Sequence, residues 1–205
     1  TYIGQHPTSG LYLDGRVDDA RIYNRALSAA EIASIASDQF THTDNVAVTV
    51  NAVNDAPLLD NAGAMALTTI SEDAISNPGN TVAFIIASAG GDRITDVDAG
   101  AEEGIAIIAL TSGNGAWEYS VNGGGSWGAV GAVSNNAALL LRSTDLLRFV
   151  PNAQNGTTAD VTFRAWDQTS GSAGSKVDVS VNGGVTAFST ATELATITVS
   201  AINDA

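Results

Sequence analysis

The sequence predicts an all-β protein whose largest part is a β-sandwich. From residue 56 to residue 205, strand-like runs alternate with clusters of Gly, Asn and Ser at intervals that are typical of a sandwich. The apolar residues of these runs are mostly Ala, Val, Ile and Leu in period-2 order, which indicates strands with a buried face. The nonapeptide at residues 48–56 also returns in similar form at residues 197–205, which defines a repeated module.

The first forty residues differ from the rest of the chain. Residues 11–23 predict two short strands around an Asp-Gly turn. Ser28 and Glu31 form a capping-box pattern, which predicts the start of a short helix. A segment of about 40 residues is too small to bury a core alone, since that takes roughly 60 residues without staples. We therefore expect residues 1–40 to be the tail of a truncated domain.

Residues 13–32 resemble the C-terminal signature of laminin-G-like (concanavalin-A-like) jelly-roll domains of secreted bacterial proteins. In these domains the strand with the Asp-Asp-Ala-Arg-Ile-Tyr run lies within the sandwich, and the helix packs on its edge. The resemblance implies that residues 1–40 are the C-terminal fragment of such a domain, a truncated jelly-roll tail with one short helix. It also implies that Asp18, Asp19 and Arg21 are scaffold charges rather than a ligand site.

Residues 41–57 predict a strand and a linker that lead into a complete domain at residues 58–205. Pro57 interrupts any β-ladder at this junction because proline has no backbone donor. The complete domain has about 150 residues, enough to bury a full core, and its pattern indicates no interior helix. We expect its strands near residues 64–70, 81–87, 105–111, 116–121, 137–141, 146–150, 159–166, 176–181 and 194–201.

The charge of the chain favours cations as partners. There are 22 Asp and Glu against 8 Lys and Arg, which gives a formal net charge of -14. Binding to nucleic acid, or to an anionic membrane through a basic face, is therefore not expected. Cysteine is absent, so disulfides are excluded, but metals can staple an extracellular domain instead. No apolar run reaches about 18 residues, so we expect no membrane insertion in this segment.

The run at residues 95–100 is the strongest chemical candidate. Asp96 and Asp98 project to one side of an extended or looping backbone, and Gly100 allows a sharp turn. Oxygen donors gathered in this way suit Ca²⁺, which takes about six to eight oxygen ligands. An EF-hand is excluded, because Ile107 stands where that loop requires Glu. A solvated loop without metal is the alternative interpretation.

Other acidic and amide residues strengthen this candidate. An Asn-Asp linker, a Glu near the first strand, an Asp-x-Asp loop and an Asp after the penultimate strand resemble the ligand set of cadherin repeats, especially the bacterial cadherin-like repeats of very large surface adhesins. The Asn-Asp-Ala-Pro linker at residues 54–57 and the segment at residues 149–156 carry the same resemblance. It implies a Greek-key, Ig/cadherin-like β-sandwich that binds Ca²⁺ at the seams between successive domains. The implied ligands are Asn54, Asp55, Asp96, Asp98 and Asp167 at the N-terminal seam, and Glu72, Asn203 and Asp204 at the C-terminal seam.

The C-terminal seam departs from this pattern. Animal cadherins carry Asp-Arg-Glu where residues 152–155 read Asn-Ala-Gln-Asn. Fewer carboxylates weaken the attraction for a divalent ion, so we expect this seam to bind fewer ions or none. Where an ion binds, we expect it to neutralise carboxylates that otherwise repel one another and let the linker swing, and so to lock neighbouring modules end to end.

Residues 120–127 resemble an Asp-box hairpin with Asn122 in the place of the Asp. In families with this box, the side chain closes the turn and the Trp packs beneath it, so the resemblance implies a folding device. Trp117, Tyr119 and Trp127 are expected to pack in the core, because aromatic residues in an alternating strand usually face inward. An exposed platform that stacks on sugar rings is the alternative.

Catalysis is not expected. His6 and His42 both lie outside the complete domain, a cysteine nucleophile is absent, and nothing fixes a separation for the acids at residues 102, 103 and 118. The resemblance implies a calcium-stiffened spacer of a large extracellular, secreted or cell-surface adhesin, whose partners are neighbouring domains of the same chain and a cell-surface glycan or protein. One alternative is a carbohydrate-binding accessory module of a secreted polysaccharide-degrading enzyme. A purely structural repeat without metal is another.

Overall fold

The computed structural model describes residues 21–38 and 47–203. The chain divides into two compact units, unit 1 at Thr1–Val50 and unit 2 at Asn51–Ala205. Strands in sheets account for most of the regular structure of the described residues, together with two short helices. The predicted all-β class is therefore confirmed, whereas the Greek-key and cadherin-like topology stays a prediction.

In unit 1 the predicted helix is α1 (Ala29–Asp38), and its capping box forms. The Glu31 N–H donates to Ser28 Oγ at 3.3 Å, and the Ser28 N–H donates to Glu31 Oε2 at 2.8 Å. Arg25 donates to both carboxylate oxygens of Glu31, at 3.1 and 2.5 Å. The hydrogen bonds that the Glu31 carboxylate accepts, first from Arg25 and then from Ser28, lower the pKa of Glu31 to about 2.

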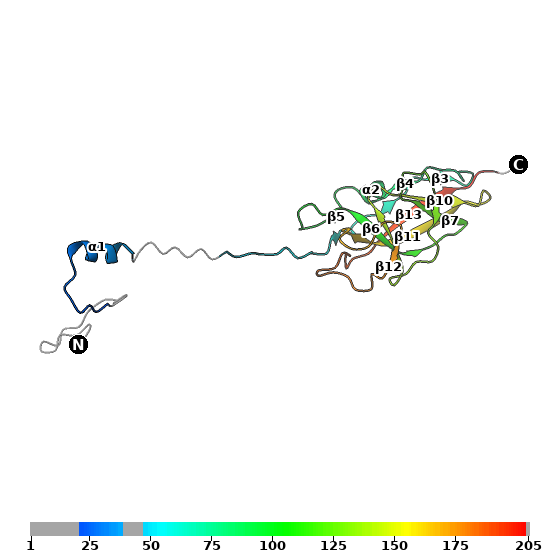
Figure 1. Ribbon diagram of the computed structural model, residues 1–205. Coiled ribbons are helices and arrows are strands. Elements are labelled where there is room, and N and C mark those ends of the chain that lie inside the picture. Colours follow the sequence, from blue (N-terminus) through cyan, green and yellow to red (C-terminus); the bar gives the residue numbers. More distant parts are fainter. Residues whose placement is uncertain (1–20, 39–46, 204–205) are drawn as a thin grey trace, which may run out of the picture. The chain divides into compact units, whose positions relative to one another are not determined.

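Unit 2 contains two main sheets (Figure 1). The larger sheet has seven strands. Six follow the order β12-β9-β6-β11-β13-β2, and the seventh, β3, also pairs with β13. β13 is parallel to β2 and to β3, and the other pairs are antiparallel. The smaller sheet has the order β4-β10-β7-β8, and β1 pairs with β5 separately. The strands are β1 (Leu58–Leu59), β2 (Met65–Ala66), β3 (Ile70–Ser71), β4 (Asn80–Thr81), β5 (Ile94–Thr95), β6 (Gly104–Leu110), β7 (Gly115–Ser120), β8 (Gly128–Ala129), β9 (Ala138–Arg142), β10 (Leu146–Pro151), β11 (Thr157–Trp166), β12 (Lys176–Val177) and β13 (Glu193–Ser200).

The main hydrophobic core combines residues of both sheets. β11 buries Ala159, Val161 and Phe163 at every second position. β10 of the smaller sheet does the same with Leu147 and Phe149. All five residues belong to one buried cluster, so the period-2 pattern supplies the two facing surfaces of a sandwich-like domain.

A second buried cluster uses the opposite side of the larger sheet. β9 contributes to both clusters, since Leu139 and Leu141 join the main core whereas Ala138 and Leu140 join the second cluster. Phe188, from the segment between β12 and β13, packs in that second cluster. This covering segment explains why β9 is a continuous apolar run rather than an alternating one.

The predictions of a strand at residues 81–87 and of no helix inside this domain were wrong, because the segment forms α2 (Val82–Ala87). Thr81 caps the helix, and its Oγ1 accepts the N–H of Phe84 at 3.1 Å. Three of its residues, at helical spacing i, i+3 and i+4, are buried in the core. A short apolar run has no period that separates a strand from a helix, so the cap and the packing decide. The buried residues are Val82, Ile85 and Ile86.

Six predicted strands are confirmed, as β6, β7, β9, β10, β11 and β13. The run at residues 64–70 is interrupted, because the N–H of Thr68 donates to Asn80 Oδ1 at 3.0 Å instead of to a neighbouring strand. Of the strand expected at residues 176–181, only β12 pairs. The strands expected over residues 11–23 lie largely outside the described residues, and their described end has no strand.

The chain enters unit 2 beside β5 and leaves it beside β3, at opposite ends of the unit (Figure 1). The two copies of the repeated nonapeptide differ, because residues 197–200 of the second copy lie in β13, whereas residues 48–56 form no strand. β13 has ladder partners on both sides, in β11 and β2, and the first copy has none in the described part of the chain. The described residues that were predicted for the two seams thus lie at separate ends of unit 2.

Candidate metal centre

At the N-terminal end of unit 2, the five residues predicted for the first seam form two hydrogen-bonded sets, Asn54 with Asp167 and Asp55 with Asp98 and Asp96. Asn54 Nδ2 donates to Asp167 Oδ2 at 2.9 Å. The Asp55 N–H donates to Asp98 Oδ2 at 2.8 Å, and the Asp98 N–H donates to Asp96 Oδ1 at 2.9 Å. The linker, the loop after β5 and the residue after β11 therefore meet at one place.

Local bonds explain the shape of the two loops. Asp96 closes an Asx turn with the Asp98 N–H, and Gly100, with a φ of 84°, lies in the left-handed region that glycine tolerates. Asp167 Oδ1 accepts the N–H of Thr169 at 2.8 Å and its hydroxyl at 2.6 Å. These two bonds hold the Asp167 carboxylate so that Oδ2 meets the linker.

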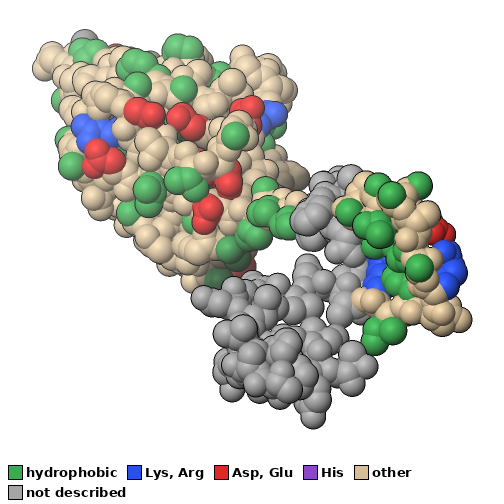
Figure 2. Space-filling view, turned by 90° about the vertical axis from the view of Figure 1, so that its left-hand side faces the viewer, with side chains coloured by type: hydrophobic (Ala, Val, Ile, Leu, Met, Phe, Trp, Pro, Cys, Tyr) green, Lys and Arg blue, Asp and Glu red, His purple; other side chains and the backbone are tan. Residues whose placement is uncertain are grey.

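An acidic cavity of about 270 Å³ lies beside this cluster. Asp96 Oδ2 is buried and has no hydrogen-bond partner, which is uncommon for a buried polar atom and marks a place where a ligand could bind. Figure 2 shows Asp and Glu side chains at several places on the visible face of unit 2. The carboxylates that line the cavity are Asp92, Asp96, Asp98, Glu102 and Glu103, and no Lys or Arg of the described residues lines it.

The donor chemistry of this end fits a hard cation, but without a closed cage of carboxylates. Within residues 21–38 and 47–203, no three acidic or imidazole groups are gathered as a metal-binding cluster. A bound cation would therefore need neutral oxygens as well, which calcium accepts from carbonyl and amide groups. Such oxygens are present, because Thr186 O and Asp55 O each lie 3.2 Å from Asn54 Nδ2.

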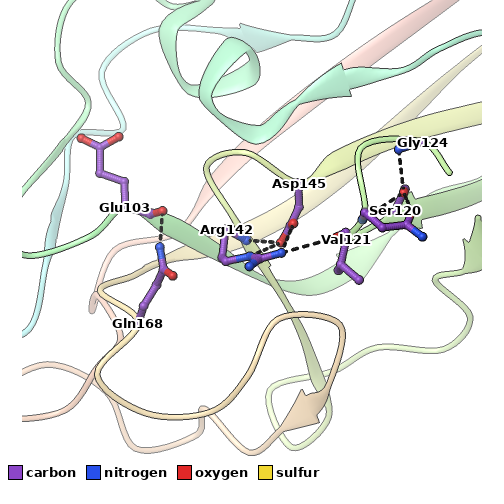
Figure 3. A network of polar contacts seen from close by, with 8 residues as sticks. Glu103, Ser120, Val121, Gly124, Arg142, Asp145 and Gln168 are labelled. Atoms are coloured by element: carbon purple, nitrogen blue, oxygen red, sulfur yellow. Dashed lines mark hydrogen bonds and ion pairs between the residues drawn. The ribbon is translucent and has the colours of Figure 1, made fainter. Parts of the chain in front are cut away.

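A polar network adjoins the cavity (Figure 3). Gln168 Nε2 donates to the main-chain oxygen of Glu103 at 2.8 Å, so the residue after Asp167 is tied to the cavity lining. Gln168 has a φ of 66°, a conformation that few residues other than glycine adopt. Nearby, Arg142 pairs with the buried Asp145 at 2.8 Å. The bond from Gln168 to Glu103 thus joins the segment after β11 to the segment before β6, next to the acidic loops.

Burial raises the pKa of Glu103, and the negative charge of Asp92 raises it further. With a raised pKa in the folded state, the stability that Glu103 contributes is fully present below its unfolded pKa and is lost as pH rises through the folded pKa. The difference between the melting temperature of Glu103→Gln and that of the unsubstituted protein should therefore increase in favour of the variant as pH rises from about 4 to 7. Scanning calorimetry at several pH values measures this difference. The exposed Glu102→Gln is the control, and an equal gain in both variants would contradict the assignment.

At the C-terminal end, Glu72 directly follows β3 and is completely buried. Its Oε1 accepts the N–H of Ile202 at 2.6 Å, whereas Oε2 has no partner. A buried carboxylate with an orphaned oxygen is unfavourable unless a cation or a donor completes it. Glu72 thus contacts Ile202, the residue before Asn203. Asn203 is exposed, and Asp204 lies outside the described residues.

The neutral loop at residues 152–155 forms its own turn near the end of β10. Asn152 Oδ1 accepts the N–H groups of Gln154 at 3.0 Å and of Asn155 at 3.1 Å. Ala153 has a φ of 58°, in the left-handed region. This amide side chain stabilises the loop itself, and the loop contributes no negative charge.

The turn at Asn122 forms as the Asp-box resemblance implies. Asn122 Oδ1 accepts the N–H of Ser126 at 2.9 Å. Ser120 Oγ accepts the N–H of Gly124 at 2.9 Å (Figure 3). The asparagine therefore replaces aspartate as the turn-closing side chain.

The aromatic residues of this hairpin form no open platform. Trp117 is buried, and its ring meets Phe149 edge-on with the centroids 5.1 Å apart. Trp127 is half-buried, and Arg148 Cζ lies 3.9 Å from the centroid of its ring. One face of Trp127 is thus covered, which disfavours the alternative of stacking on sugar rings.

Some residues at the N-terminal end of unit 2 were not identified as site residues from the sequence. Asp92 was missed, and Glu102 and Glu103 were considered only as catalytic acids, although their position on both sides of the Asp-x-Asp loop was a usable signal. Glu118, the third such acid, instead pairs with an arginine of β10 at 2.6 Å. Thr186 takes part through its main-chain oxygen, which leaves no signature in a sequence.

Unit 2 is thus an all-β, sandwich-like domain with acidic residues gathered where the chain enters it and a buried glutamate where the chain leaves it. Comparisons with protein-family models, with curated proteins and with solved structures find no match to this chain. None of the helices among the described residues is long and apolar enough to cross a membrane.

Proposed function

We propose that unit 2 is a non-catalytic, calcium-binding module of a large extracellular adhesin, and that calcium stiffens it as a spacer between neighbouring domains. The observation that carries this proposal is the contact of the linker residues Asn54 and Asp55 with Asp167 and Asp98. Through these bonds, the direction of the linker depends on the groups that would hold the ion. An ion bound here would therefore act on the joint between two domains.

The chemistry of this end supports calcium rather than a transition metal. Cysteine is absent from the chain, and the groups at this end are carboxylate, amide and carbonyl oxygens, which are hard donors. Binding to the folded state adds about 1.4 kcal/mol for each tenfold excess of free ion over Kd. Calcium sites of extracellular modules commonly have a Kd of about 10⁻⁴–10⁻³ M, so such a site would be filled only outside the cell.

Isothermal titration of the 205-residue chain with calcium chloride tests the proposal. We expect a heat of binding in the unsubstituted protein, and its loss in the double variant Asp96→Asn/Asp98→Asn, because two of the charged oxygen donors are neutralised. The double variant Asp178→Asn/Glu193→Gln removes the same charge elsewhere in unit 2 and should keep the heat. Absence of heat at millimolar calcium in the unsubstituted protein, or full heat in the first variant, would overturn the proposal.

A further inference from the structure

Asp167 is a buried carboxylate whose hydrogen-bond partners are all neutral. It is 4 % exposed, and its Oδ1 accepts the N–H and the hydroxyl of Thr169. Its Oδ2 accepts a hydrogen bond from Asn54 Nδ2 at 2.9 Å. No Lys or Arg of the described residues forms an ion pair with it. The group that satisfies Oδ2 therefore comes from the linker.

The amide nitrogen of Asn54 lies among three oxygen atoms. Besides Asp167 Oδ2, it is 3.2 Å from Thr186 O and 3.2 Å from Asp55 O. The nitrogen of an amide can donate two hydrogens, whereas its oxygen can only accept, so these surroundings fix the nitrogen inward. A neutral donor thus stands at the point where the carboxylate and two carbonyl groups converge.

We propose that Asn54 is an uncharged clasp that docks the linker root, residues 54–56, on unit 2 without any ion. Two more hydrogen bonds close the same joint. The Asp55 N–H donates to Asp98 Oδ2 at 2.8 Å, and the Ala56 N–H donates to Gly184 O at 2.8 Å. With this clasp, the linker root is held on unit 2 in the absence of calcium, in place of the freely swinging linker expected from the sequence. The clasp itself does not depend on the proposed function, but its effect on the response of the joint to calcium does.

That consequence follows from the neutrality of the amide. An aspartate at position 54 would place a second carboxylate against Asp167, and the two charges would repel each other strongly because Asp167 is shielded from water. The linker root would then dock only when a cation offsets the repulsion. The amide of Asn54 therefore keeps the joint closed at low calcium and makes it less dependent on the ion.

Amide hydrogen exchange of the 205-residue chain, followed by NMR in EDTA and in millimolar calcium, tests the clasp. The reporters are the Asp55 and Ala56 amides, and the amide of Phe163 in β11 shows that the core stays folded. In EDTA, Asn54→Asp and Asn54→Ala should each lose protection at the two reporters by about tenfold or more. The control Asn51→Asp adds the same charge on an exposed linker residue and should keep it.

Calcium should restore the protection in Asn54→Asp but not in Asn54→Ala. The clasp is overturned if both Asn54 variants keep the protection in EDTA, or if the two reporters of the unsubstituted protein exchange freely there. If the EDTA results are as expected but calcium changes nothing in any variant, the clasp stands and the calcium proposal fails. The two ideas can thus fail separately.

Discussion

Phe149→Ala is expected to lower the free energy of unfolding of unit 2 by about 3–5 kcal/mol. Phe149 is fully buried on β10 and packs against Trp117. The packing on this side is tight, since a Cβ atom added at Gly115 would lie 2.4 Å from the Phe149 ring. The variant would therefore leave a cavity between the two sheets that the neighbours can fill only in part. Chemical denaturation followed by tryptophan fluorescence measures the loss.

Phe84→Ala is the matched control, because it removes the same atoms from a position on α2 that is 48 % exposed. We expect this variant to lose less than about 1 kcal/mol, as surface substitutions usually do. Similar losses in the two variants would mean that the space between the sheets is not the main source of stability.

Long strands such as β10 and β11 could be predicted because one face of each strand is buried in the core and the other is not, which produces an alternating pattern of apolar residues in the sequence. In β11, Ala159, Val161 and Phe163 enter the core while the residues between them face outward. Strands of two residues, such as β1, β5 and β8, leave no period at all, and their pairing depends on which segment the fold brings beside them. The length of a strand, rather than the type of its residues, therefore limits which strands could be predicted from the sequence.

The repeated nonapeptide shows how context overrides local preference. Both copies begin with three β-branched residues, yet only the second copy forms a strand, with residues 197–200 in β13. A strand is stable only when its N–H and C=O groups find a ladder, and β13 finds one on each side. A pattern of residues thus indicates what a segment can form, and its neighbours decide whether it does.

The candidate site was predictable only in part. Asn54 and Asp167 lie far apart in the chain, so their contact at 2.9 Å could be expected from a family resemblance but not from spacing. The resemblance concerned side-chain types, and therefore said nothing of the direction of the Asn54 amide or of the carbonyl of Thr186. The inward nitrogen becomes apparent only when the oxygens around it are placed in space.

Glu72→Gln is expected to stabilise unit 2 in EDTA and, where an ion also binds at the C-terminal end, to reduce the stabilisation by calcium. In EDTA the variant should be more stable by about 1 kcal/mol, because an amide is less unfavourable than an ionised carboxylate at a buried position whose Oε2 has no partner. The amide oxygen of glutamine can still accept the N–H of Ile202. In calcium, the unsubstituted protein should gain about 2.7 kcal/mol at a free ion concentration one hundred times Kd. If Glu72 holds the ion, the variant loses most of that gain.

Thermal melting of both proteins in EDTA and in calcium measures both effects. A gain of that size raises the melting temperature by roughly 5–10 °C in a protein of about 200 residues. Glu193→Gln, on a half-buried residue at the start of β13, should follow the unsubstituted protein in both conditions. Equal stabilisation of the unsubstituted protein and Glu72→Gln by calcium would place the ion away from the C-terminal end. A variant that is clearly less stable in EDTA would mean instead that another group already compensates the Glu72 carboxylate.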